Sequence, residues 1–147
     1  MRLNKDLREF LELLNARGVD FLVVGAHSLA FHSRPRYTGD LDILVRPTEE
    51  NAAALVQLLN EFGFPESNFS VSDFAEGDQI VQLGRAPNRI DLLTSLTGVT
   101  NTEAFGGKVA AEIDGVTVFF LGKTQLIQNK RAVGRPQDLA DLAELEN

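Results

Sequence analysis

The chain has 147 residues, 44% of them hydrophobic and 24% charged, a composition typical of a single globular domain that would span residues 1–147. Its formal net charge of −7 argues against broad, sequence-independent binding of nucleic acid, which needs a basic surface. The absence of cysteine excludes disulfides and thiolate metal sites. Because the sequence has neither an apolar run long enough to span a membrane nor an apolar signal core, we expect a cytoplasmic protein.

Helices and strands alternate in the first half of the chain. Leu7, Phe10, Leu11 and Leu14 recur at the three- and four-residue spacing of one helix face, and Gly18 follows where a helix would end. Apolar runs bounded by glycines and capping residues indicate the neighbouring elements. The predicted helices cover 4–17, 26–32 and about 48–62, and the predicted strands cover 21–24 and about 40–45.

The second half combines strands with short helices. Asp114-Gly115 is a strong signal for a two-residue hairpin turn, Ser72 is a candidate cap for one helical turn, and Pro136 suits the first position of the last helix. The predicted strands cover 80–83, 89–93, 108–113 and 116–121, and the predicted helices cover 73–76, 102–105, 123–133 and 136–145. This order predicts an α+β fold in which a mixed β-sheet carries helices packed mainly on one side.

Two aspartates, Asp40 and Asp42, open the apolar run Leu41–Val45. Because a strand repeats every two residues, both carboxylates project from the same face. Parallel carboxylates at the start of a buried strand are costly to desolvate unless a positive group lies between them, and a divalent cation with oxygen ligands fits that position. The alternative is a solvent-facing acidic turn, in which Asp40 is a cap and Asp42 a surface residue.

A third acid, Asp91, lies between Ile90 and Leu92 in a strand that is otherwise strongly apolar. A carboxylate in such a strand either pairs with an arginine, Arg89 or Arg85, or binds a cation. Both interpretations stay open on the residues alone.

The junction Gly25-Ala26 connects a predicted strand directly to a predicted helix. Glycine lets the backbone pass close to a ligand, and the N–H groups that open the helix form a natural phosphate cradle. An ordinary turn is the alternative.

Three segments, FLVVGAHSLAFHSRPRYTGDLDILV, RIDLLTSLTGV and LIQNKRAVGRPQDLADLAEL, resemble the DNA polymerase β-like nucleotidyltransferase superfamily. More narrowly, they resemble the small bacterial nucleotidyltransferases related to AbiEii-type abortive-infection toxins, over roughly residues 8–145. The resemblance implies the nucleotidyltransferase fold and transfer of a nucleoside monophosphate from an NTP to a hydroxyl of a tRNA, a protein or a small molecule. It also implies Mg²⁺ as a pair of ions, with Mn²⁺ as the alternative, and a toxin or antitoxin protein as a further partner.

Residue by residue, the resemblance implies that Asp40 and Asp42 are metal ligands of both ions. Asp91 would bind the ion that activates the acceptor hydroxyl, and all three aspartates would be catalytic. The implied nucleotide-binding residues are Gly25, Ala26, Ser28, Thr38 and Lys130.

Within this set, Gly25 and Ala26 would hold the β and γ phosphates, and Lys130 would reach the nucleotide. Many members of the family have serine or glycine where this chain has Ala26, and Ser28 is the candidate to replace the missing hydroxyl.

Further residues have weaker assignments. Asp138 and Asp141 match a terminal acidic pair of the family. Three arginines are candidates to meet the triphosphate or the acceptor, with an exposed cation as the alternative for each: Arg34, Arg36 and Arg135. His27 and His32 are interpreted as residues of a helix face rather than as participants.

Two other functions compete with the enzyme. A catalytically inactive relative would keep the fold and bind a nucleotide or a protein partner, and the departure at Ala26 motivates this alternative. A glycosyltransferase that uses Asp-x-Asp with Mn²⁺ is a poorer interpretation, because such enzymes need a larger nucleotide-binding sheet than 147 residues provide.

Overall fold

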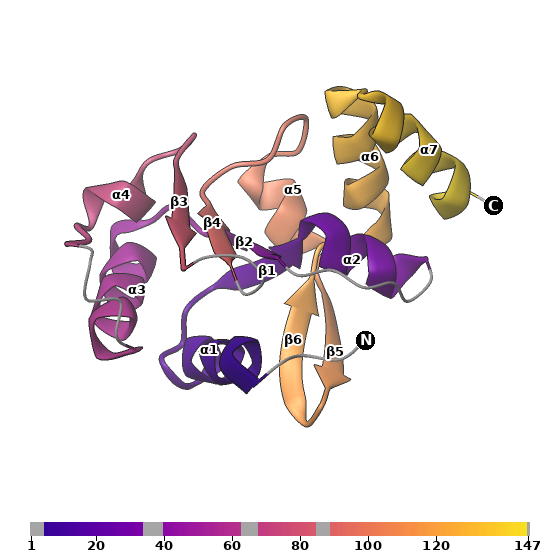
Figure 1. Ribbon diagram of the computed structural model, residues 1–147. Helices are drawn as coiled ribbons and strands as arrows, with labels where there is room; N and C mark the ends of the chain where they lie inside the picture. The colour runs from indigo at the N-terminus through magenta and orange to yellow at the C-terminus, as the bar shows by residue number, and fades with distance from the viewer. Residues whose placement is uncertain (1–4, 34–39, 63–67, 85–88, 147) are drawn as a thin grey trace.

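The computed structural model describes residues 5–33, 40–62, 68–84 and 89–146. A mixed six-stranded sheet organises these residues, with the strand order β3-β4-β2-β1-β6-β5 (Figure 1). The strands are β1 (Phe21–Val24), β2 (Leu41–Val45), β3 (Ile80–Leu83), β4 (Ile90–Leu93), β5 (Val109–Ile113) and β6 (Val116–Phe120). The helices are α1 (Lys5–Ala16), α2 (Gly25–His32), α3 (Glu49–Phe62), α4 (Ser72–Ala75), α5 (Asn101–Gly106), α6 (Lys123–Val133) and α7 (Pro136–Leu145). This arrangement confirms the predicted α+β fold with a mixed sheet.

Parallel and antiparallel pairs alternate across the sheet. The central strand β1 pairs antiparallel with β2 and parallel with β6, and β2 pairs parallel with β4. At the two edges, β3 pairs antiparallel with β4 and β5 pairs antiparallel with β6. The β2–β4 pair is the one that matters for function, because it aligns the strands that carry the predicted acids.

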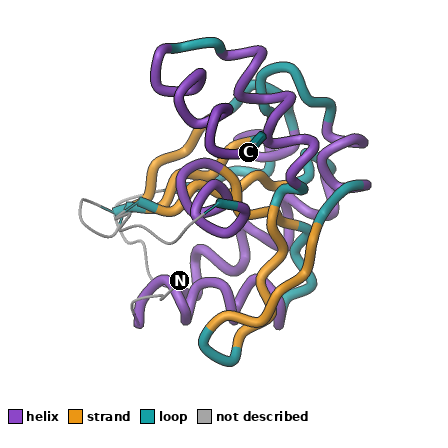
Figure 2. The backbone as a smooth tube through the Cα atoms, turned by 90° about the vertical axis from the view of Figure 1, so that its right-hand side faces the viewer, coloured by secondary structure: helices purple, strands orange, loops and turns teal. Residues whose placement is uncertain are grey.

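The two faces of the sheet carry separate hydrophobic cores. Phe21 and Val23 of β1 belong to one core with buried residues of α1, α3 and α4. Leu22 and Val24, which alternate with them, belong to the other core, together with residues of α2, α5, α6 and α7. Figure 2 shows helices on either side of the strands.

Helices therefore cover both faces, which corrects our expectation that they would pack mainly on one. The physical reason is visible in β1, where all of Phe21–Val24 is buried. A strand that is apolar at every position, rather than at alternate ones, needs cover on both sides. None of the helices in the described ranges is both long and apolar enough to cross a membrane.

Two of the three turn and capping predictions discussed here are confirmed at the ends of helices and strands. Asp114 and Gly115 both have positive φ, 50° and 81°, as a tight turn between β5 and β6 requires. Pro136 lies at the start of α7 as predicted. Ser72 was expected to cap α4 but lies inside its first turn, and the Asp73 carboxylate instead accepts a hydrogen bond from the Ser70 N–H at 2.9 Å.

Candidate functional site

The β2–β4 register brings two of the three predicted acids side by side. Asp42 of β2 lies opposite Asp91 of β4 in this parallel pair. The Leu41 N–H donates to the Arg89 carbonyl at 3.0 Å, which aligns the starts of the two strands and puts Asp40 next to Arg89. Asp42 and Asp91 alternate with residues of the α1–α3 core, so they project toward the opposite face, the one covered by α2, α6 and α7.

Arg89 holds two of these carboxylates. Its Nε donates to Asp91 Oδ1 at 3.0 Å and its Nη2 to Asp91 Oδ2 at 3.1 Å. The same Nη2 lies 3.3 Å from Asp40 Oδ2. The structure thus pairs Asp91 with an arginine, one of the two interpretations that the sequence left open. The other arginine considered, Arg85, lies outside the described residues.

The environment of Asp42 disfavours its ionised carboxylate. The pKa of Asp42 is raised to about 6, first by burial and then by the charge of Asp91 and a hydrogen bond with Asp91. The positive charge of Arg89 lowers this pKa, but by a smaller amount. A carboxyl group that is this hard to ionise would gain from further positive charge nearby. Arg89 therefore compensates the charge of Asp42 only in part.

The donor set fits a hard divalent cation in its chemistry but is not arranged as a finished metal site. Carboxylate oxygens are the ligands that Mg²⁺ prefers. In the part of the chain that the structure describes, however, no group of three or more His, Cys, Asp or Glu side chains is positioned to hold a metal ion. Arg89 occupies oxygens of Asp91 and Asp40 that a cation would use.

Gly25 lies directly against Asp42. Its φ is +65°, and a Cβ added there would lie 2.2 Å from Asp42 Oδ2. Only glycine lets the start of α2 approach the carboxylate this closely. The predicted phosphate loop and the predicted metal ligand are thus neighbours, and Ala26 follows in the first turn of α2.

Ser28 does not offer its hydroxyl proton to a ligand in this structure. The side chain is fully buried, and Oγ donates to the Gly25 carbonyl at 3.0 Å within α2. The hydroxyl therefore stabilises the first turn of the helix, and it is not available in this geometry to replace the hydroxyl that Ala26 lacks.

His27 is a residue that sequence reasoning assigned to a helix face and that the structure buries near the acids. It is 3% exposed, and neither ring nitrogen has a hydrogen-bond partner among the described residues. Burial lowers the pKa of His27, while the backbone and charge of Asp40 act against that shift. The position of His27 in this short helix gives no sequence signal for its burial.

Lys130 lies in an ion cluster between α6 and α7. Its Nζ is 3.2 Å from Asp138 Oδ1 and 3.1 Å from Asp141 Oδ2. Arg135 Nε donates to Asp138 Oδ2 at 2.7 Å. Asp138 is only 1% exposed, and the hydrogen bond from Arg135, followed by that from Lys130, holds the pKa of its carboxyl well below the usual range.

This cluster stabilises the α6–α7 pair in the structure as it stands. The predicted contact of Lys130 with a nucleotide remains a prediction, and so does a ligand contact of Arg135. Three other residues named from the sequence lie outside the described residues: Arg34, Arg36 and Thr38.

The end of α2 is anchored on the same side of the sheet. His32 Nε2 lies 2.6 Å from the Leu121 carbonyl oxygen, and Ser33 Oγ donates to Glu144 Oε2 at 3.2 Å. The helix that begins at Gly25 is thus fixed to the strand end and to α7 (Figure 1). His32 thus has a structural partner in this strand end.

Solved structures with similar folds are nucleotidyltransferase-like proteins. The assigned nucleotidyltransferase TM1012 from Thermotoga maritima superposes with a TM-score of 0.63 at 19% identity, over 96% of this chain and 90% of that one. The lincosamide antibiotic adenylyltransferase LnuA, solved with lincomycin bound, superposes with a TM-score of 0.65 at 12% identity, over 99% of this chain and 98% of that one. An antigenic nucleotidyltransferase-like protein from Paracoccidioides brasiliensis superposes with a TM-score of 0.55 at 15% identity, over 99% of this chain and 76% of that one. At these identities the similarity shows the fold alone.

The sequence itself gives the family. No curated protein matches it. Residues 3–147 match the family described as "Nucleotidyl transferase of unknown function" (DUF2204), which is nearly the whole chain. The chain therefore belongs to this nucleotidyl transferase family, and its mixed sheet and paired aspartates agree with that assignment.

Proposed function

We propose that the protein is a Mg²⁺-dependent enzyme that transfers a nucleoside monophosphate from an NTP to an acceptor hydroxyl. Asp40, Asp42 and Asp91 would hold the cations, two Mg²⁺ or alternatively Mn²⁺, which neutralise the triphosphate charge. The observation that supports this most is the pairing of Asp42 with Asp91 on adjacent parallel strands, with Gly25 against the Asp42 carboxylate.

In the proposed reaction, the acceptor oxygen forms a bond to the α-phosphorus while the bond from that phosphorus to the pyrophosphate oxygen breaks. Pyrophosphate leaves with the electrons of the broken bond, and Asp91 is the proposed acceptor of the hydroxyl proton. Ala26 and the other N–H groups that open α2 would face the β and γ phosphates. The protein's contribution is to position groups and to compensate charge.

Arg89 has to release its carboxylates for this site to form. Its side chain is partly exposed, so the guanidinium can turn toward solvent when cations take up the same oxygens. In that arrangement Arg89 keeps the acidic cluster stable before substrate arrives, because it compensates charge that would otherwise destabilise the fold.

The acceptor and the biological setting are narrower proposals. LnuA was solved with lincomycin, a small molecule, which supports testing small alcohols beside tRNA and protein acceptors. A setting with a toxin or antitoxin partner is supported by the sequence resemblance over residues 8–145 to AbiEii-type proteins.

An inactive relative that binds a nucleotide or a protein partner is the second candidate. Two observations favour it: Arg89 occupies Asp91 and Asp40, and Ala26 stands where many members of the resembled family have serine or glycine. In this case the aspartates and Arg89 would be a structural ion cluster.

The experiment that separates these candidates uses NTPs labelled at the α-phosphate, Mg²⁺ and a cell extract as the source of acceptors. We expect label transfer with the natural protein, none with Asp42→Ala, and full transfer with Glu50→Ala, which removes an exposed acid from α3. Equal labelling by the natural protein and Asp42→Ala would exclude the enzyme proposal. Calorimetry with ATP, CTP, GTP and UTP that shows binding without turnover would favour the inactive relative.

A further inference from the structure

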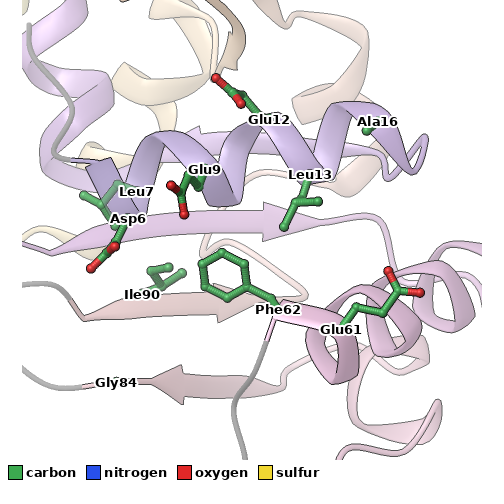
Figure 3. Close-up of a pocket in the computed structure, with 10 residues that line it drawn as sticks. All are labelled: Asp6, Leu7, Glu9, Glu12, Leu13, Ala16, Glu61, Phe62, Gly84 and Ile90. Carbon is green, nitrogen blue, oxygen red and sulfur yellow. The ribbon is translucent and has the colours of Figure 1, made fainter.

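A groove of about 810 Å³ lies beside α1 (Figure 3). It runs between α1, the end of α3 and the strands β3 and β4, and Ile90 contributes to its lining. Ile90 belongs to the α1–α3 core, whereas Asp91, the next residue, projects to the other face. The groove is therefore separate from the proposed catalytic site.

The floor of the groove is apolar. Leu13 of α1, Phe62 of α3 and Ile90 of β4 line it. Figure 3 shows the Phe62 ring and Ile90 beneath α1, with Leu13 directed toward them. Leu13 and Phe62 are only partly buried, so the floor retains apolar surface that a ligand could cover.

Among the residues that the structure describes, the rim of the groove is acidic. Asp6 and Glu9 lie three residues apart on α1, which places them on the same side of that helix, and Glu61 of α3 lies near the opposite end of α1 (Figure 3). Neither Asp6 nor Glu9 has an ion pair with any residue in the described ranges. Glu61 contacts Arg17 in an exposed pair, and such pairs contribute little to stability.

The length of the groove also constrains its occupant. Its lining follows α1 from Asp6 to Ala16, which corresponds to about 15 Å, or roughly three helical turns. An amphipathic helix of similar length, with apolar residues on one face and cations beside them, would complement both the floor and the rim.

We infer that this groove binds a basic amphipathic helix of another protein. A second copy of this chain is a poor occupant, because its net charge of −7 would repel the acidic rim. The most basic helix among the described residues, α6, already has internal partners: Lys130 pairs with Asp138 and Asp141, and Arg131 pairs with Glu146.

The test uses a fluorescent synthetic peptide made of two copies of the heptad Leu-Lys-Lys-Leu-Leu-Lys-Lys, titrated with the full chain. The variant Asp6→Lys/Glu9→Lys should weaken binding on the order of tenfold or more, because it reverses charge at the rim. The matched control Glu49→Lys/Glu50→Lys makes the same charge change on exposed acids in the first turn of α3, and it should bind nearly as the natural protein does. Leu13→Asp should also weaken binding, because it places a charge on the apolar floor of the groove.

Mapping of amide chemical shifts completes the test. We expect the peptide to shift signals of Leu13, Phe62 and Ile90. Equal loss of affinity in the rim variant and its control would overturn the inference, since binding would then follow net charge alone. Shifts centred on Asp42 and Asp91, or a dimer in sedimentation that the rim variant dissociates, would overturn it as well.

Discussion

Asp42 is the residue at which folding and the proposed chemistry conflict. Its pKa is raised to about 6 from a model-peptide value of 3.8, chiefly by burial and then by Asp91. The folded state therefore binds a proton more tightly than the unfolded state. Stability decreases as the pH rises from 3.8 through 6, and above pH 6 the full penalty is present. A functional acid that destabilises its own fold is common at active sites.

Replacing Asp42 by asparagine should stabilise the protein at high pH while abolishing nucleotidyl transfer. We expect the free energy of unfolding at pH 8 to rise by on the order of 1–2 kcal/mol, after allowance for partial exposure, because the charge penalty is removed. The gain should vanish near pH 4, and urea unfolding at both pH values measures it. Glu50→Gln, at an exposed position, should show no gain. A loss of stability at pH 8 in Asp42→Asn would contradict this account.

Gly25 can be tested against a glycine with the same backbone conformation. Gly18 has φ +66° and nothing within 4 Å of an added Cβ, whereas at Gly25 the Cβ would meet Asp42 Oδ2. Gly18→Ala should thus cost only the left-handed strain, about 1–2 kcal/mol. Gly25→Ala should cost roughly 1–3 kcal/mol more, because Asp42 must move. Thermal unfolding of both variants measures the difference, and equal losses would mean that Asp42 does not press on Gly25.

At the scale of elements, the α6–α7 pair is stabilised by charge as well as by apolar contact. Asp138 at the start of α7 accepts from Lys130 and Arg135, so its carboxylate is buried but compensated. Its folded-state pKa lies below the unfolded value. The stabilisation is therefore complete above about pH 3.8 and is lost as the pH falls further.

Removing this carboxylate should destabilise the helix pair strongly. Asp138→Ala breaks a buried ion pair, so we expect a loss of about 3–5 kcal/mol at neutral pH. Glu146→Ala, which breaks the exposed pair with Arg131, should cost less than about 1 kcal/mol. Chemical denaturation of both variants is the measurement. A loss below about 1 kcal/mol for Asp138→Ala would show that the cluster is not structural, and would favour a ligand role for Lys130.

Most elements could be predicted from the sequence because their signals are local. Period-2 and helical spacings, the Asp114-Gly115 turn and Pro136 each depend on residues close in the chain. The cover on both sheet faces could have been inferred from the uninterrupted apolar run Phe21–Val24, which we did not weigh. Ser72 was misassigned because serine is equally acceptable at the cap and in the first turn.

The proximity of the three aspartates could be predicted from the sequence, but their contacts could not. Spacing alone placed Asp42 on the same face as Asp40, and parallel pairing with β4 then placed Asp91 beside it. The choice between an arginine and a cation as partner of Asp91 depends on side-chain geometry, which no spacing encodes. The burial of His27 likewise depends on how α2 is seated against Asp40.

At the scale of the whole molecule, the sheet separates two regions with different chemistry. One face carries the aspartates, Arg89 and the start of α2, and the other carries the acidic groove along α1. Because β4 contributes Asp91 to one side and Ile90 to the other, a partner in the groove and a nucleotide at the aspartates would contact opposite faces of one strand. In the proposed function the aspartates hold divalent cations, and Arg89 takes the place of the cations when they are absent.

A titration of Mn²⁺, followed by electron paramagnetic resonance, measures this binding in the natural protein, in Arg89→Ala and in Asp42→Ala. We expect the natural protein to bind Mn²⁺ and Asp42→Ala to bind none. Arg89→Ala should bind about tenfold more tightly, because the competing guanidinium is removed from beside Asp91 and Asp40. Absence of Mn²⁺ binding in both the natural protein and Arg89→Ala would contradict the account and leave the aspartates as a structural ion cluster.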